Sequence, residues 1–222
     1  MNGERENGIP PREGATTSAS GQTTRERSNR LGEILRFNER FVREKAFASF
    51  VTDRFPDKKL VILTCMDTRL VELLTKAMNL KNGDAKIIRN AGAIVTQPFG
   101  NVMRSIIVAL YELGADEVMV VGHHDCGMTA LDSGRILEKM LSRGIRPEVL
   151  ETLKNSGIDL GRWLTGFDSV REGVERSVSI IRNHPLLPAD TPVHGLIMDP
   201  VTGKLDLVTD GYEYLKTVKA RA

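Results

Sequence analysis

Apolar residues follow two periods along this chain, and their alternation predicts its elements. Short apolar runs typical of buried strands occur in "LVILTC" (60–65), "AKIIRN" (85–90) and "EVMVVG" (117–122). Each run precedes a segment with apolar residues three and four positions apart, the period of a helix: "LVELLTKAM", "VMRSIIVALYELG" and "MTALDSGRILEKML". Three strand–helix units in succession predict an α/β fold, in which helices cover both faces of a parallel sheet.

The same patterns extend to both ends of this unit. An amphipathic helix is predicted from Leu31 to Phe50, where apolar residues again recur at helical spacing, and further helical segments near 147–155 and 168–183. "VHGLIMDPVTGKLDLVTDG" is hairpin-like, with "PVTG" as its turn. We therefore expect a single domain over residues 31–222.

Residues 1–30 have a different composition. They are rich in Gly, Ser, Thr, Arg and Glu and contain almost no large apolar side chains. Such a segment cannot offset the entropy cost of ordering, so we predict a disordered N-terminal tail. A transit peptide is the competing interpretation, but transit peptides usually lack acidic residues, and this tail contains Glu4, Glu6, Glu13 and Glu26.

Composition and charge restrict the possible binding partners and the cellular compartment of the protein. The 222 residues carry a formal net charge of only +2, and the charges are scattered, which argues against a nucleic acid or an anionic membrane as partner. The sequence has no apolar stretch of the roughly 18–20 residues that a membrane span needs and no secretory signal, so we expect a cytoplasmic protein. Its two cysteines, Cys65 and Cys126, are then expected to be thiols.

Charged residues directly follow the first predicted strand, in "VILTCMDTRL". Taken singly, Cys65 could be a buried core thiol, and Asp67 could cap a helix that begins near Thr68. Arg69, however, would lie in the first turn of that helix, where a cation opposes the helix dipole. An unfavourable position of this kind indicates a specific partner, and Asp67 is the nearest one.

The third predicted strand also ends in residues that can bind metal, in "GHHDCGM". Taken singly, each could be a structural residue, such as a core histidine. If the first and third strands are neighbours, His123 and Cys126 lie beside Cys65 at the carboxyl edge of the sheet, where ligands bind in open α/β folds. Two thiolates and an imidazole form a Zn²⁺ ligand set that leaves the fourth tetrahedral position open, as in catalytic sites.

The combination of "CMDTR", "IIRNAGA" and "GHHDCG" resembles the β-class carbonic anhydrases, from about Leu31 to the end of the chain. The motifs are most similar to a compact prokaryotic branch that includes the YtiB-like proteins. The resemblance implies a mostly parallel sheet, four parallel strands plus one added strand, and a homodimer as the smallest unit. It also implies one Zn²⁺ per chain, held by Cys65, His123 and Cys126, with Asp67 and Arg69 as the catalytic dyad.

By this resemblance the reaction is the reversible hydration of CO₂ to bicarbonate and a proton. Zinc lowers the pKa of bound water from about 16 towards 7, so zinc-bound hydroxide can attack CO₂ near neutral pH. Asp67 would orient the hydroxide, and Arg69 would keep Asp67 ionised and away from the metal. Family members in which the aspartate closes the site carry a Trp three residues before the first cysteine. This chain has Ile62 there, so an open site is expected.

The positions of four further residues indicate roles for them. Gly92, in "RNAGA", allows close approach of the backbone, and the family implies a backbone contact to substrate there. His124 and Asp125 are candidates for proton transfer to buffer, with surface polarity and helix capping as the alternatives. Trp163, the single tryptophan, lies between predicted helical segments and is expected to pack rather than bind a ligand.

The motifs leave other functions open. The same zinc site could hydrolyse CS₂ or COS, which are linear molecules with a similar electrophilic carbon. A zinc-binding homologue without turnover would be expected to have lost a dyad residue, whereas both Asp67 and Arg69 are present. A zinc-free α/β binding domain is the remaining alternative.

Overall fold

The computed structural model describes residues 29–220. The predicted tail lies outside these residues except for its last two positions, and its disorder stays a prediction. Asn29 caps the first helix, α1 (Arg30–Arg43), by accepting a hydrogen bond from the Gly32 N–H through Oδ1 at 3.0 Å. The chain divides after Ser49 into two units, which we describe separately.

The first unit contains α1 and the start of a 3₁₀-helix, η1 (Ala46–Phe50). The prediction of one continuous helix from Leu31 to Phe50 is wrong, because α1 ends at Arg43. Two residues later Lys45 adopts a left-handed conformation with φ of +54°, which no α-helix accommodates. Most apolar side chains of α1 are exposed, including those of Leu31 and Phe37, whereas Phe41 is half-buried.

A five-stranded sheet forms the centre of the second unit. Its strands are β1 (Leu60–Cys65), β2 (Ala85–Asn90), β3 (Glu117–His123), β4 (Val193–Met198) and β5 (Leu205–Thr209), in the order β2-β1-β3-β4-β5. The first four strands of this order are parallel, and β5 pairs with β4 in the antiparallel direction as the second arm of the predicted hairpin. The predicted α/β sheet of four parallel strands plus one added strand is confirmed.

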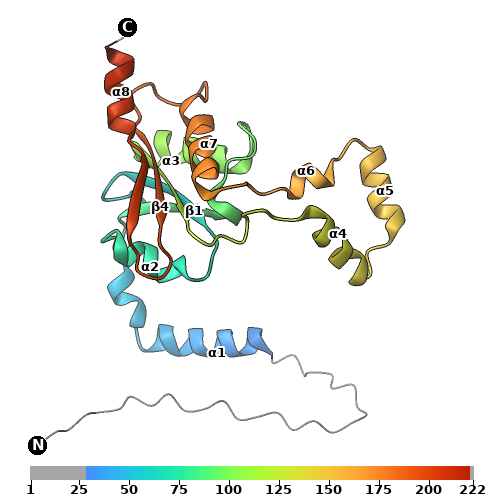
Figure 1. The fold of residues 1–222 in the computed structure, drawn as a ribbon. Helices are drawn as coiled ribbons and strands as arrows, with labels where there is room; N and C mark the ends of the chain where they lie inside the picture. The colour runs from blue at the N-terminus through green and yellow to red at the C-terminus, as the bar shows by residue number, and fades with distance from the viewer. Residues whose placement is uncertain (1–28, 221–222) are drawn as a thin grey trace, which may run out of the picture. The chain divides into compact units, whose positions relative to one another are not determined.

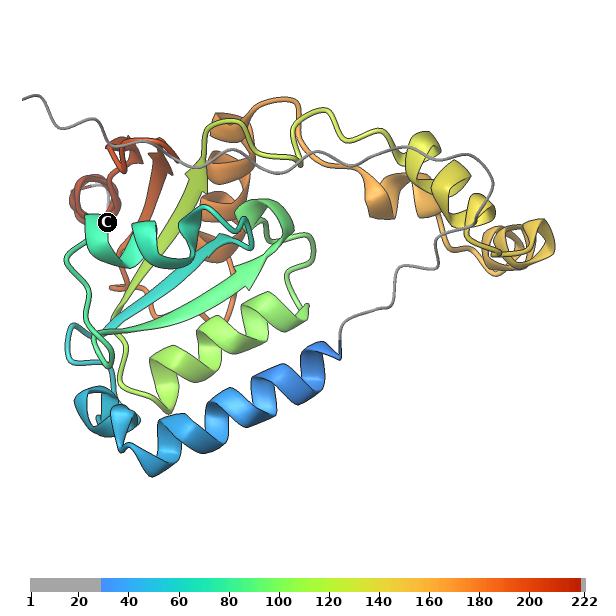
Figure 2. The same ribbon diagram turned by 90° about the horizontal axis from the view of Figure 1, so that it is seen from below.

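Helices cover this sheet on both faces (Figures 1 and 2). Along β1, Val61 and Leu63 pack with α3 (Asn101–Tyr111) and α7 (Val170–Arg182), whereas Leu60 and Ile62 pack with α2 (Leu70–Ala77) on the other face. All six residues of β1 are buried, as a strand covered on both sides requires. The two apolar layers hold the carboxyl ends of β1 and β3 at one edge of the sheet.

Three short helices separate β3 from α7, namely α4 (Ser133–Ser142), α5 (Pro147–Asn155) and α6 (Leu160–Leu164). They lie together to one side of the sheet, and we call residues 131–165 the arm (Figures 1 and 2). The chain enters and leaves the arm through adjacent segments, since Thr129 bridges Phe167. The prediction that a helix begins at Met128 is therefore wrong, and α4 starts only after Asp132, whose Oδ1 accepts from the Arg135 N–H at 3.1 Å.

Two helices were not predicted from the periodicity. One is α6, which is five residues long, and the other is α8 (Gly211–Lys219), which follows β5 and is capped by Asp210. The α8 pattern carries few apolar residues, and only Gly211 of this helix is buried. Within residues 29–220, no helix is long and apolar enough to cross a membrane.

Candidate functional site

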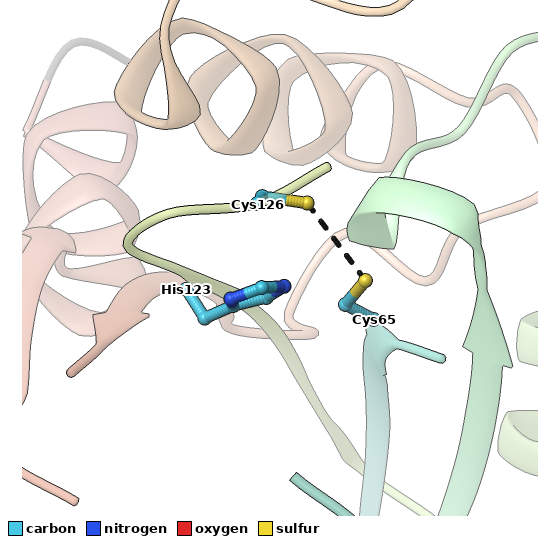
Figure 3. A group of neighbouring side chains, drawn as sticks. All are labelled: Cys65, His123 and Cys126. Atoms are coloured by element: carbon cyan, nitrogen blue, oxygen red, sulfur yellow. Dashed lines mark hydrogen bonds between the residues drawn. The ribbon is translucent and has the colours of Figure 1, made fainter. Parts of the chain in front are cut away.

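The three predicted metal ligands lie together at the carboxyl edge of the sheet. β1 and β3 are parallel neighbours, Cys65 is the last residue of β1, and His123 is the last residue of β3. Cys126 follows three residues later, and its Sγ lies 3.9 Å from that of Cys65. The ligand atoms of the three residues all lie within 4.8 Å of one another, and Figure 3 shows the side chains pointing towards a common point.

The His123 ring is oriented as a metal ligand requires. His123 is fully buried, and its Nδ1 lies 2.8 Å from the His124 carbonyl oxygen, so Nδ1 carries the proton and donates. Its Nε2 is buried and has no hydrogen-bond partner in the described part of the chain. An unpaired buried acceptor is costly, and a cation between Nε2 and the two sulfurs would satisfy it. The donor set of two thiols and one imidazole fits Zn²⁺.

Hydrogen bonds prepare one thiol of the pair for ionisation. The Cys126 side chain donates to Cys65, and the Gly92 N–H, 3.4 Å from Cys65 Sγ, adds to this stabilisation of the thiolate. Together they lower the pKa of Cys65 to about 4, against the opposing effect of burial. The negative charge on Cys65 and burial raise the pKa of Cys126. A divalent cation would favour the thiolate form of both residues.

Asp67 and Arg69 form a close ion pair beside this cluster. Arg69 Nε donates to Asp67 Oδ1 at 3.0 Å, Arg69 Nη2 donates to Asp67 Oδ2 at 2.9 Å, and the Arg69 backbone N–H also donates to Asp67 Oδ1. α2 begins at Leu70 and has Arg69 at its cap position, yet Asp67 Oδ1 accepts from the Arg69 backbone N–H at 2.8 Å, so Asp67 also satisfies a donor at the start of this helix. Asp67 Oδ2 lies 3.7 Å from His123 Nε2, so the pair borders the metal cluster.

The ion pair also fixes the charge of Asp67. The side-chain hydrogen bonds from Arg69 lower the pKa of Asp67 to about 2. A group with a lowered pKa adds stability above its ordinary pKa and loses it as the pH falls through the lowered value. Asp67 is therefore ionised throughout the neutral range, and its contribution is lost only below about pH 4.

Asp125 holds the other side of the same guanidinium. Arg69 Nη1 donates to Asp125 Oδ2 at 2.8 Å, and Arg69 Nη2 donates to the Asp125 carbonyl oxygen at 2.9 Å. Asp125 adopts a left-handed conformation with φ of +53°, and it caps no helix, because the cap of α4 is Asp132. Arg69 thus ties the loop after β1 to the loop after β3. This contact was not predicted, since nothing in the sequence indicates which loops the side chain can reach.

Gly92 lies in the short 3₁₀ turn η2 (Ala91–Ala93) after β2 and contacts Cys65 through its N–H. Its φ is +83°, and a Cβ placed there would lie 2.9 Å from the Phe167 ring and 3.0 Å from Met128 Cγ. Phe167 and Met128 therefore cover the turn that contacts the cluster. The sequence carries no signal for either residue, because both come from segments joined only in three dimensions.

We expect Gly92→Ala to destabilise the protein by about 2–4 kcal/mol, from a left-handed backbone bearing a side chain and from contact with the Phe167 ring. Gly127→Ala is the matched control, since within residues 29–220 no heavy atom outside its two chain neighbours lies within 4 Å of a Cβ at Gly127. Urea unfolding of the two metal-free variants measures the difference. Equal midpoints would show that the turn tolerates a side chain.

A third residue that the sequence analysis missed is Arg89, the residue before the end of β2. Its Nη1 donates to the Cys65 carbonyl oxygen at 3.3 Å, and its Nη2 donates to the Leu70 carbonyl oxygen at 3.0 Å. Arg89 thereby braces the segment that carries Cys65, Asp67 and Arg69. An arginine inside an apolar strand was a signal that could have identified it.

The remaining histidines and the single tryptophan have the following surroundings. His124 is exposed, and its Nε2 lies 3.9 Å from Asp206 Oδ2. His184 and His194 are buried elsewhere in the fold and take no part in the cluster. The prediction that Trp163 lies between helices and packs is wrong, because this residue lies in α6 and its exposed fraction is 70%.

Comparison with known proteins agrees with this geometry. The family model for carbonic anhydrase matches residues 60–205. The chain is 61% identical to the carbonic anhydrase homologue YvdA of Bacillus subtilis over 183 residues, which are 82% of this chain and 93% of YvdA. It is 58% identical to the homologue YtiB of the same organism over 182 residues, 82% of this chain and 97% of YtiB.

A solved structure and an enzyme of different specificity are also similar. The crystal structure of β-carbonic anhydrase isoform I from Trichomonas vaginalis superposes with a TM-score of 0.75 at 33% identity, covering 83% of this chain and all of that one. A carbon disulfide hydrolase from an Acidianus strain is 32% identical over 161 residues, 67% of this chain and 76% of the hydrolase. The fold, the motifs and these similarities agree, and the chain belongs to the β-class of the carbonic anhydrase family.

Proposed function

We propose that this protein catalyses the reversible hydration of CO₂ to bicarbonate and a proton. One Zn²⁺ per chain would be held by Cys65, His123 and Cys126. The observation that carries the proposal is the position of the Asp67–Arg69 pair beside the cluster, with Asp67 Oδ2 3.7 Å from the unpaired His123 Nε2. A metal site that served only structure would need neither an ionised carboxylate nor its arginine at this place.

When bound, Zn²⁺ supplies the Lewis acidity that makes water a nucleophile near neutral pH. Asp67 accepts a hydrogen bond from this nucleophile through Oδ2, which orients it towards the carbon of CO₂. Arg69 keeps Asp67 ionised and holds both of its oxygens, so the carboxylate acts as an acceptor and does not move to the metal. The backbone at Gly92 is the proposed contact to substrate.

The open form of the site is favoured by the hydrogen bonds of Arg69. Three donors of Arg69 bind Asp67 and two bind Asp125, so turning Asp67 towards the metal would break a network that spans two loops. Ile62 is buried beneath the site and offers no polar atom that could stabilise the closed arrangement. A metal-edge spectrum showing a carboxylate ligand at about pH 8 would contradict this assignment.

The product proton must reach solvent, and we propose His124 as its carrier. His124 follows a metal ligand directly and is exposed, with Asp206 nearby. An imidazole has two ring nitrogens, so one can accept a proton while the other passes a proton to buffer. Turnover of His124→Ala in weak buffer should be lower than that of the wild type and should recover in concentrated imidazole buffer. Equal turnover in weak buffer would remove His124 from the mechanism.

We expect activity to rise towards alkaline pH. Two thiolates neutralise most of the charge on zinc, so the metal should acidify water less than it does among three histidines. Asp67 does not cause this rise, because its pKa of about 2 leaves it ionised at every pH of the assay. The initial rate of CO₂ hydration, measured by stopped flow from about pH 6 to 9, tests the expectation, and a flat profile would contradict it.

Hydrolysis of CS₂ is the second candidate function, and the similarity to a carbon disulfide hydrolase supports it. The same nucleophile could attack either carbon, so the metal ligands and the dyad do not distinguish the substrates. Parallel assays of CO₂ hydration and of H₂S release from CS₂ or COS on one zinc-loaded sample separate the two. Release of H₂S without CO₂ hydration would replace the proposed function.

We further propose a homodimer in the cytoplasm. The exposed apolar side chains of α1, among them Leu31, Ile34 and Phe37, are more than an isolated surface helix needs, which supports burial against a second copy. Thiolate ligands require a reducing compartment, which supports the cytoplasm. Light scattering at micromolar concentration should give twice the mass of one chain, and a monomer would count against the dimer.

A further inference from the structure

We propose a second ligand site, for the phosphate group of a small phosphomonoester, in a cavity between η2, the end of the arm and α7. The cavity has a volume of about 310 Å³. Arg162 and Arg176 line it from two different helices, α6 and α7. The hydroxyl-bearing side chains of Thr96, Thr165 and Ser177 complete its polar lining.

The charge of this cavity is unbalanced. No Asp or Glu is among its lining residues, and no carboxylate within residues 29–220 forms an ion pair with Arg162 or Arg176. Arg69 at the metal cluster, by contrast, has Asp67 and Asp125 as partners. Two guanidinium groups without a carboxylate partner, lining one concave site, can bind an oxyanion by forked hydrogen bonds.

Two positive charges favour a dianion over a monoanion. A phosphomonoester is mostly dianionic at pH 7, because its second pKa is about 6, and its three terminal oxygens can accept from two guanidiniums at once. Bicarbonate and chloride carry a single charge. The cavity thus matches the chemistry of a phosphate group better than that of the anion produced in the proposed reaction.

An adjoining cavity gives room for the body of such a ligand. It has a volume of about 680 Å³ and shares Thr96, Arg162 and Thr165 with the first cavity. Its other lining includes Asn101 and Trp163, an amide and an exposed aromatic face. Such side chains contact sugar-like groups through hydrogen bonds and stacking. A single carboxylate, Asp159, lines this second cavity, so the anionic group belongs in the first.

This site is separate from the metal cluster. None of Cys65, Asp67, Arg69, His123 and Cys126 lines either cavity. Phe167 stands between them, since it lines the first cavity and also lies over Gly92, whose N–H contacts Cys65. Binding of a phosphate ester is therefore a property of the chain beyond the proposed hydration of CO₂, and it does not depend on the metal.

The experiment titrates the zinc-loaded full chain with ribose 5-phosphate, inorganic phosphate and chloride at constant ionic strength, by calorimetry. Trp163, the single tryptophan, adjoins Arg162 and provides a local fluorescence signal. We expect saturable binding of the ester, weaker binding of inorganic phosphate and none of chloride. Each of Arg162→Ala and Arg176→Ala should weaken ester binding about ten- to a hundredfold, the effect of losing hydrogen bonds to a charged group.

Arg171→Ala is the control, because Arg171 is a charged residue of the same helix α7 that lines neither cavity. It should leave the affinity unchanged. Arg176→Lys retains the charge but loses the fork, and it should fall between the wild type and Arg176→Ala. Unchanged affinity in the Arg162/Arg176 double variant, or equal binding of chloride, would overturn the site. Inorganic phosphate binding as tightly as ribose 5-phosphate would overturn its assignment to an ester.

Discussion

Asp67→Asn is expected to lower CO₂ hydration at least about a hundredfold while zinc content stays at one ion per chain, the effect typical of removing a preorganised hydrogen-bonding group at the reacting atoms. The amide keeps the shape of the carboxylate but loses its charge, so it cannot hold the bidentate ion pair with Arg69. Arg69 would keep its contacts with Asp125 and turn away from the nucleophile. Stopped-flow rates with metal analysis of the same samples measure the effect.

Asp125→Asn is the matched control for this variant. Asp125 is the other carboxylate bound to Arg69, and its Oδ2 lies 2.8 Å from Arg69 Nη1. The substitution removes the charge of this carboxylate. Because Asp125 has no contact with the cluster except through Arg69, its loss should reduce the rate less than about tenfold. If the two variants lose activity equally, the carboxylates act only by holding Arg69, and the proposed role of Asp67 is wrong.

Cys65→Ser should release the metal. The hydroxyl of serine stays protonated, whereas the Cys65 thiol ionises readily because its pKa is about 4. The variant therefore lacks one of the three metal ligands. Zinc affinity should fall more than about a hundredfold, since even residues that merely support a ligand cost ten- to a hundredfold. The increase in melting temperature that zinc gives the wild type should disappear. Calorimetric zinc titration and thermal unfolding measure both quantities.

Met66→Ala serves as the control for Cys65→Ser. Met66 is the next residue in the chain, and its side chain is exposed, so its loss should change neither zinc affinity nor the stabilisation by zinc. A Cys65→Ser protein that still binds one zinc with wild-type affinity would show that the metal is held elsewhere. Comparison in the presence of a chelator separates the loss of metal from any change in the metal-free fold.

The sequence predicted the parallel sheet because its strands are buried on both faces, and such runs as "LVILTC" are distinctive. It also predicted the convergence of Cys65 with His123 and Cys126, since strand ends are a topological property once β1 and β3 are neighbours. Helix ends were harder. α1 ends before Lys45, which has a left-handed backbone, and α4 starts only after the Thr129–Phe167 bridge. The apolar period continues past both points, so it does not show these helix ends.

Contacts between distant loops could not be predicted in this way. The bond from Arg69 to Asp125 depends on how far the loop after β3 folds back, and the cover of Gly92 by Phe167 depends on where the arm returns. Neither follows from local propensity, because the residues are brought together by tertiary structure alone. The exposed position of Trp163 has the same origin, since a short helix on the arm has no sheet beneath it.

The two ends of the arm lie side by side, and this arrangement affects which sequence changes the protein can tolerate. Thr129 and Phe167 are adjacent, and Gly166 lies so close to Met128 that a Cβ would fall 1.8 Å from its carbonyl oxygen. The segment between these positions is held at its base, so changes in its length or sequence need not move a metal donor. Arg162 lies on the arm, and Arg176 lies outside it, on α7. Changes in the arm could therefore create or remove the proposed phosphate site, while the chemistry at the strand ends stays the same.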